Sequence, residues 1–215
     1  MKDLYPHINP ALQEYVVIHI LPQYRKFDAA HRIEHAKKVI TDSLQMASDY
    51  DVRQDMVFTV AAYHDIGLSE GRELHHVVSG RLLREDSVLR QWFTQEEIEV
   101  MAQAVEDHRA SAKHPPRSIY GCIVAEADRH ICLTTIIRRT VQYGCAHYPE
   151  LDREGHIKRV LDHLEEKYSR RGYLRLWIPG SANEKALQQV WDAIDDYEGL
   201  RKRVENEIDS FVWRE

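Results

Sequence analysis

The residues with the clearest capacity for chemistry are an adjacent histidine and aspartate, His64 and Asp65. They end an apolar stretch, residues 57–67 with the sequence VFTVAAYHDIG, whose helical periodicity places His64 on the core-facing side. We expect Gly67 to stop this helix. The carboxyl end of a helix carries partial negative charge, so an imidazole and a carboxylate there favour a bound cation. Taken alone, such a pair is more often a core histidine beside a solvated aspartate.

Four further positions place histidine or aspartate on otherwise apolar helical faces. His108, for example, continues the face that carries Met101 and Val105. Burying an ionisable group is costly unless the group is paired or bound to a metal. One such residue is ordinary, but five positions of this kind are difficult to explain by packing. Besides the His64–Asp65 pair, the positions are His35, His75 or His76, His108 and Asp128.

In this order the residues resemble the HD-domain superfamily of metal-dependent phosphohydrolases. The resemblance covers residues 20 to 132 and implies an all-α helical bundle. Its local forms are His35-x-x-x-Val39, His64-Asp-Ile-Gly, His75-x-x-x-Ser79 and Ala127-Asp128-Arg129. The ordered set is specific for fold and metal, and it says little about the substrate.

The resemblance also implies two divalent ions. The first would be held by His35, His64, Asp65 and Asp128, and the second by His75 and His108, with Asp65 bridging and serving as the catalytic carboxylate. His76 is the alternative to His75, whose spacing to Ser79 fits the family form better. Imidazole and carboxylate ligands without thiolate favour Mn, Fe, Mg, Co or Ni, with Zn possible.

Two close metal ions suit the hydrolysis of phosphoesters by a metal-activated water. The predicted function is therefore hydrolysis of a nucleotide or another small phosphate ester. One alternative is a catalytically silent metal-binding regulatory or interaction domain, and another is a single structural metal site in a helical interaction module. Arginines that could bind phosphoryl oxygens are Arg72 and Arg109 beside the ligands, and Arg138 and Arg139 on the following helix.

For each of these arginines, a solvated surface charge is an equally good interpretation. Lys167 and Tyr168 are weaker candidates for the same role. His31 lies four residues before His35. That spacing could mark a zinc pair, although a residue at the rim of the site is the simpler interpretation.

Three subfamily patterns are missing, which leaves the substrate open. The five-prime nucleotidase branch has an acid where Leu68 stands. The guanosine-tetraphosphate hydrolase branch has Glu-Asp close behind the pair, where this chain has Leu68 and Ser69. The cyclic-dinucleotide branch has a Gly-Tyr-Pro element that residues 107–111 do not contain. What remains resembles small, uncharacterised bacterial HD hydrolases.

Every long apolar stripe has helical periodicity, so the fold is predicted to be all-α. Thr94, Ser118, Asp152 and Ser181 are expected helix caps. A short extended segment is expected at residues 173–178. Helices are predicted at residues 10–27 with a kink at Pro22, 31–48, 57–64, 75–85, 94–108, 118–128, 134–146 and 152–168, with a last helix from 181 to about 211.

The whole chain, with 215 residues, is expected to form a single HD-type domain. Its metal-binding core would span about 20–132, and a C-terminal helical extension about 133–215 carries an apolar stripe that could serve a homodimer. A net charge of -6 argues against nucleic acid, although it is compatible with a small phosphorylated substrate. No apolar run suits a signal peptide or a membrane span. The cysteines Cys122, Cys132 and Cys145 lack a C-x-x-C pair, which fits buried thiols and a cytoplasmic location.

Overall fold

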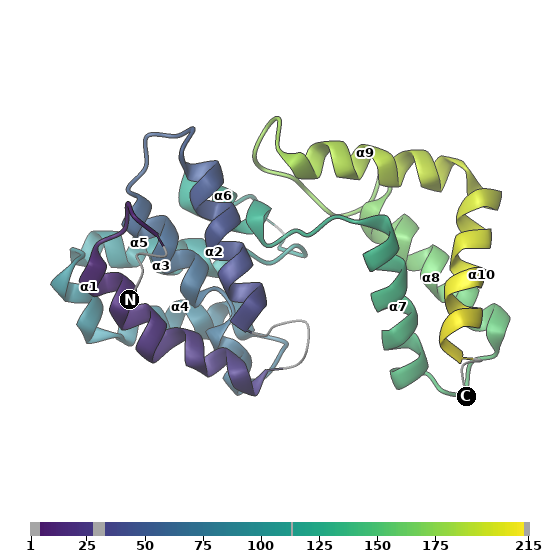
Figure 1. Ribbon diagram of the computed structural model, residues 1–215, viewed down its shortest axis with the longest axis horizontal. Helices are drawn as coiled ribbons and strands as arrows, with labels where there is room; N and C mark the ends of the chain where they lie inside the picture. The colour runs from purple at the N-terminus through teal and green to yellow at the C-terminus, as the bar shows by residue number, and fades with distance from the viewer. Residues whose placement is uncertain (1–4, 28–32, 113, 213–215) are drawn as a thin grey trace. The chain divides into compact units, whose positions relative to one another are not determined.

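The structure is a computed structural model that describes residues 5–27, 33–112 and 114–212 (Figure 1). These residues form helices and connecting segments and contain no strand, so the all-α prediction is confirmed. The chain divides after Arg129 into two compact units, Met1–Arg129 and His130–Glu215. Each unit is described by itself. No helix in the described ranges is both long enough and apolar enough to cross a membrane.

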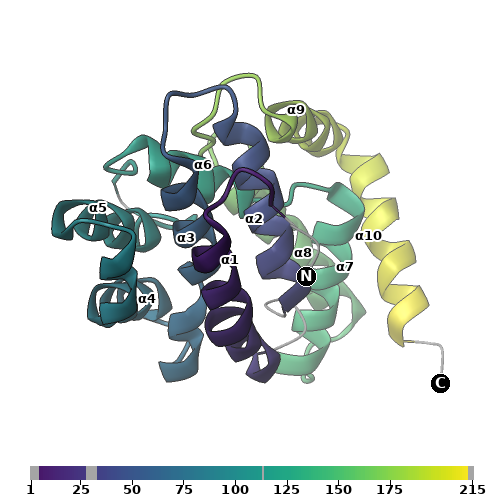
Figure 2. The ribbon, with the colours of Figure 1, turned by 60° about the vertical axis from the view of Figure 1, so that its left-hand side comes forward.

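The first unit is a bundle organised around one buried helix, α3. Every residue from Met56 to Tyr63 in α3 is buried, and α3 contacts α2, α4, α5, α6 and η1. Figures 1 and 2 show α3 between α2 on one side and α5 on the other. The elements are α1 (Pro10–Tyr15), η1 (Val16–Ile20), η2 (Leu21–Lys26), α2 (Ile33–Ala47), α3 (Gln54–Tyr63), η3 (Ile66–Glu70), α4 (His75–Glu85), η4 (Ser87–Gln91), α5 (Gln95–Glu106) and α6 (Ile119–Ala127).

Local capping explains where several helices begin. The Thr94 hydroxyl accepts from the Glu97 amide while the Glu97 carboxylate accepts from the Thr94 amide, which completes the predicted capping box of α5. Ser118 caps α6 without a reciprocal bond, through its hydroxyl, which accepts from the Gly121 amide. Near Pro22 the chain passes from a π-helical turn, η1, into a 3₁₀ turn, η2, so the expected kink takes the form of a change in helix type.

The expectation that Gly67 stops the helix of the His-Asp pair is wrong. Helix α3 ends at Tyr63 with His64 as its C-cap, and Gly67 lies inside η3 without a positive φ angle. Instead, Gly67 permits a close approach of two backbones. A Cβ atom at this position would lie 2.1 Å from the carbonyl oxygen of His75 and 2.6 Å from the amide nitrogen of Ser79. The missing side chain therefore lets η3 pack against the first turn of α4.

The second unit contains α7 (Leu133–His147), α8 (Arg153–Tyr168), α9 (Ala182–Asp195) and α10 (Tyr197–Val212). Helix α8 contacts α7, α9 and α10. Asp152 and Ser181 cap α8 and α9 as predicted. The prediction of one long last helix is wrong, because the chain breaks at Asp196. Its carboxylate accepts from the Gly199 amide and starts α10 as a new helix.

The structure also bears on two smaller expectations. Residues 173–178 contain no strand, and the amides of Tyr173 and Leu174 donate back to carbonyls at the end of α8. The cysteines Cys122, Cys132 and Cys145 are free, as expected, but they are half-buried rather than buried.

Candidate metal centre

The candidate centre lies where the ends of five helices of the first unit meet. Helix α3 delivers His64 and Asp65 at its carboxyl end, and α4 begins with His75. The other contributors are His35 in the first turn of α2, His108 just after α5, and Asp128 at the C-cap of α6. His64, Asp65 and His108 are buried, whereas His35, His75 and Asp128 are half-buried. The centre therefore sits deep in the unit and reaches its surface on one side.

A first group of side chains gathers around the Oδ2 atom of Asp65. The Nε2 atoms of His35 and His64 are 3.3 Å apart. The Asp65 Oδ2 atom lies 3.2 Å from Nε2 of His64 and 3.8 Å from that of His35. Asp128 completes the group, with Oδ1 at 3.1 Å from Nε2 of His35. Two imidazole nitrogens and two carboxylate oxygens thus converge, which is a donor set that suits a divalent cation.

A second group shares the same aspartate. The Nε2 atoms of His75 and His108 are 3.2 Å apart. The other oxygen of Asp65, Oδ1, lies 3.4 Å from Nε2 of His75 and 3.5 Å from Nε2 of His108. The two oxygens of one carboxylate therefore face two separate histidine pairs. His35, His64 and Asp65 form one cluster that could hold a metal ion, and Asp65, His75 and His108 form another.

The backbone sets the orientation of three of the four imidazoles. The Nδ1 atoms of His64, His75 and His108 lie 2.8, 2.8 and 2.6 Å from the carbonyl oxygen three residues earlier in the chain. A carbonyl only accepts, so each Nδ1 carries a proton and each ring points Nε2 into the centre, where the neutral form of the ring presents a lone pair. Two such lone pairs face each other at 3.2 Å between His75 and His108. Because lone pairs repel, this contact requires a proton or a cation between the rings.

The electrostatics of the centre favour positive charge. Although burial opposes protonation of the His64 ring, the Asp65 and Asp128 carboxylates raise the pKa of His64 to about 9. Burial also opposes ionisation of Asp65, yet its histidine neighbours hold the pKa of that carboxyl well below its usual range. Burial likewise opposes ionisation of Asp128, yet the hydrogen bond with His35 and the other nearby histidines together lower the pKa of that carboxyl. A bound divalent cation would supply the charge that these carboxylates attract.

The positions of the two side chains favour His75 over His76 as the candidate ligand. His75 lies in the second cluster, whereas the Nδ1 atom of His76 is buried without a hydrogen-bond partner among the described residues. His31, the other histidine considered from its spacing, lies outside the described residues.

Two of the four candidate arginines lie next to the second histidine pair. Arg109 Nη1 donates to the Glu73 carbonyl at 2.8 Å, two residues before His75. The Arg72 carbonyl is the acceptor for the Nδ1 proton of His75, and the Arg72 residue is exposed. The local turn that precedes α4 therefore gathers both arginines close to the candidate centre.

The remaining candidates belong to the second unit. Arg138 on α7 pairs with Glu207, with 3.1 Å between Nε and Oε1, and Arg139 on the same helix is exposed. Lys167 Nζ lies 5.1 Å from the ring centre of Tyr168. A role for these residues in substrate binding stays a prediction.

Sequence reasoning missed the contacts that hold the backbone of the centre in place. The Tyr24 hydroxyl donates to the Ala62 carbonyl at 2.9 Å and accepts from the Asp65 amide at 3.3 Å, so it fixes the backbone that carries the His-Asp pair. The Ser79 hydroxyl accepts from the Gly67 amide at 2.8 Å. Tyr24 gives no sequence signal, because its partners are about 40 residues away. Ser79 was visible only through its spacing from His75.

Fold and centre together define an all-α domain with a His/Asp cluster that could hold metal ions. Residues 32–131 match the family model of the HD domain. HD domains bind divalent metal ions, and the members of the superfamily are generally hydrolases. Comparison with curated proteins gives no match.

One solved structure is similar to the chain. It is the crystal structure of a predicted HD superfamily hydrolase from an uncultured Thermotogales bacterium, with a TM-score of 0.50 and 21% sequence identity. The similarity covers 74% of this chain and 88% of that chain. At this identity the likeness bears on the fold.

Proposed function

We propose that the protein is a metal-dependent phosphohydrolase that acts on a nucleotide or another small phosphate ester with two divalent ions. The observation that carries the proposal is the division of Asp65 between two histidine pairs, each with facing Nε2 atoms. A single structural ion would occupy only one of these groups and would leave the other pair of convergent Nε2 atoms and its Asp65 oxygen without a cation. A site for two ions explains both pairs.

The residues fit such ions. His35, His64, Asp65 and Asp128 would hold the first, and His75 and His108 would hold the second with Asp65 between them. None of these donors is a thiolate, and the Nδ1–H groups of His64, His75 and His108 are already used by carbonyls, which leaves Nε2 as the ligand atom. When bound, two divalent ions lower the pKa of a water molecule and stabilise charge on the phosphoryl oxygens.

The protein's own residues would hold the catalytic carboxylate in place and bind the substrate phosphate. Asp65 is proposed as the catalytic carboxylate because it is 3% exposed and its two oxygens reach both groups. The Tyr24 hydroxyl and the buried helix α3 keep that carboxylate in one place. Arg109 and Arg72 would bind the oxygens of the substrate phosphate, since guanidinium donates charge-assisted hydrogen bonds to such groups.

The test is turnover of phosphomonoesters, phosphodiesters, nucleotides and cyclic nucleotides by protein loaded with Mn²⁺, with and without a chelator. We expect hydrolysis of at least one class, loss of activity on chelation, and loss in the variants His64→Ala and Asp65→Asn. Arg153→Gln, on an exposed pair of the second unit, is the control variant that keeps wild-type activity. A protein that binds two ions but turns over none of these esters would instead be a metal-binding regulatory domain.

A further inference from the structure

The segment between α5 and α6 contains an ion pair between the buried Asp107 and the exposed Arg117, which the proposed chemistry does not use. It begins at Asp107, next to His108, and reaches α6 through Arg117 and Ser118. Asp107 is only 2% exposed. Its Oδ2 atom accepts from the Arg117 amide at 2.7 Å, and its Oδ1 atom accepts from Nη2 of the same arginine at 2.8 Å. Nε of Arg117 lies 3.1 Å from both carboxylate oxygens.

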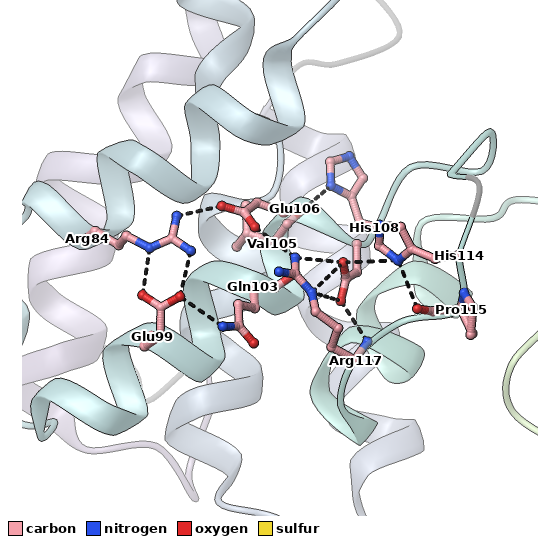
Figure 3. Close-up of polar contacts among 10 residues, drawn as sticks. Arg84, Glu99, Gln103, Val105, Glu106, His108, His114, Pro115 and Arg117 are labelled. Atoms are coloured by element: carbon pink, nitrogen blue, oxygen red, sulfur yellow. Dashed lines mark hydrogen bonds and ion pairs between the residues drawn. The ribbon is translucent and has the colours of Figure 1, made fainter.

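The same arginine also bonds to α5. Its Nη2 donates to the Gln103 carbonyl at 3.1 Å and to Glu106 Oε2 at 2.7 Å. Glu106 in turn accepts from Arg84 of α4, which also bonds to Glu99 through two nitrogens (Figure 3). The network thus ties together α4, which begins with His75, and α5, which leads to His108.

Arg109 is the functional candidate that this segment carries. One of its five N–H groups donates to the Glu73 carbonyl, just before His75, and the guanidinium keeps further donors. The segment is therefore fixed at both ends: Arg117 holds it to Asp107, and Arg109 reaches across to the turn that begins α4.

Stability alone is a poor reason for the Asp107–Arg117 pair. Removing the Asp107 carboxylate from water is costly, and the Arg117 side chain is 41% exposed, so solvent screens the attraction between the two charges. What the pair supplies is a defined orientation of the chain, because a backbone amide and a guanidinium fork bind one carboxylate in a single geometry. That geometry sets the path of the chain on both sides of His108 and Arg109.

We propose that Asp107 and Arg117 are positioning residues that hold Arg109 beside the His75–His108 pair, where its guanidinium binds an oxygen of the substrate's phosphoryl group. The inference rests on the proposed function for the identity of the ligand. The recognised chemistry is a phosphoryl oxyanion at the second histidine pair.

The experiment measures binding of inorganic phosphate to metal-loaded protein by titration calorimetry, together with metal content. Lysine keeps the charge of arginine but lacks its fork. We expect Arg117→Lys and Arg109→Lys each to weaken phosphate binding on the order of tenfold, the loss of about one charge-assisted hydrogen bond. Both variants should keep two ions. Because Arg117 acts through Arg109, the double variant should bind phosphate no more weakly than Arg109→Lys alone.

Arg81→Lys is the matched control, since Arg81 forms exposed pairs with Glu70 and Glu85 on α4 and should bind phosphate normally. Asp107→Asn provides a second variant if Arg117→Lys does not fold. A purely structural pair would lower the melting temperature while phosphate affinity stayed unchanged, or would give additive losses in the double variant, and either result overturns the proposal. So does wild-type protein that holds two ions but binds no phosphate.

Turnover separates this inference from the proposed function. Phosphate binding that depends on Arg117 in a protein without ester hydrolysis would support the positioning role and refute the hydrolase. In an active enzyme, Arg117→Lys should raise KM for the ester more than it lowers kcat, as expected for a residue that acts on ground-state binding.

Discussion

The close approach at Gly67 makes a sharp prediction about the second metal group. In Gly67→Ala, the new Cβ atom would lie 2.1 Å from the His75 carbonyl oxygen, against an ordinary contact distance of at least 3.4 Å. The atoms it meets first belong to the backbone of α4, so no flexible side chain can swing away. The first turn of α4, which carries His75, must therefore move by roughly 1 Å to restore an ordinary contact, and such overpacking shifts the backbone at a cost in stability.

That shift is large for a metal ligand, because workable ligand distances vary by only about 0.2 Å. We expect Gly67→Ala to weaken the second ion by at least about tenfold and to leave the first ion in place, since His35, His64 and Asp128 lie on other helices. Overpacking of about 2 kcal/mol should also lower the melting temperature of metal-free protein by roughly 4 to 8 °C.

Titration calorimetry with Mn²⁺ measures both binding steps. Two control variants separate the packing clash from loss of the Gly67 hydrogen bond and from the effect of replacing a glycine by alanine. Ser79→Ala removes the acceptor of the Gly67 amide without adding atoms, and Gly71→Ala places a Cβ in open space at a position with a φ angle of 117°. Wild-type affinity for both ions in Gly67→Ala would refute the packing argument, and equal loss of both would refute the separation of the two groups.

The remaining predictions concern the ligands, the proton balance and one core residue. His75→Ala and His108→Ala should each lower metal content by about one ion per chain, and an unchanged content measured by elemental analysis would refute their roles. Because the pKa of His64 is raised to about 9 from 6.5, its contribution to the stability of metal-free protein is complete below pH 6.5 and is lost as the pH rises through 9, which thermal melts from pH 6 to 10 would detect. A metal must displace that proton, so affinity should rise about tenfold per pH unit below pH 9, and calorimetry that finds no proton release at pH 7.5 would contradict this. Ser43→Ala should leave stability unchanged or raise it by up to about 1 kcal/mol, because the buried Ser43 hydroxyl has no partner among the described residues, and a loss on denaturant unfolding would show that it has one.

The parts of the fold that local chemistry determines could be predicted from the sequence. Thr94 and Ser118 cap helices through hydrogen bonds to residues three positions away, so a few neighbouring residues are enough to predict these caps. The break at Asp196 was missed because the apolar stripe continues across it, although an aspartate three residues before Gly199 is also a local capping signal. Periodicity reports which face is buried, and it does not report whether one helix or two carry that face.

The candidate ligands of the centre could be predicted from the sequence, but the residues that hold those ligands in place could not. Histidine and aspartate on apolar faces stand out because burial of such groups needs a reason. Tyr24 and Arg117 do not stand out, since their contacts with Asp65 and Asp107 depend on how distant or looped segments meet. Gly67 shows a third case: a glycine needed for close approach looks the same in a sequence as one needed for a helix stop.

The most direct test of the account is anomalous diffraction from crystals of the protein grown with Mn²⁺. The account predicts two anomalous peaks on either side of the Asp65 carboxylate, one among His35, His64 and Asp128 and the other between His75 and His108. A single peak at saturating Mn²⁺, or peaks away from Asp65, would contradict it.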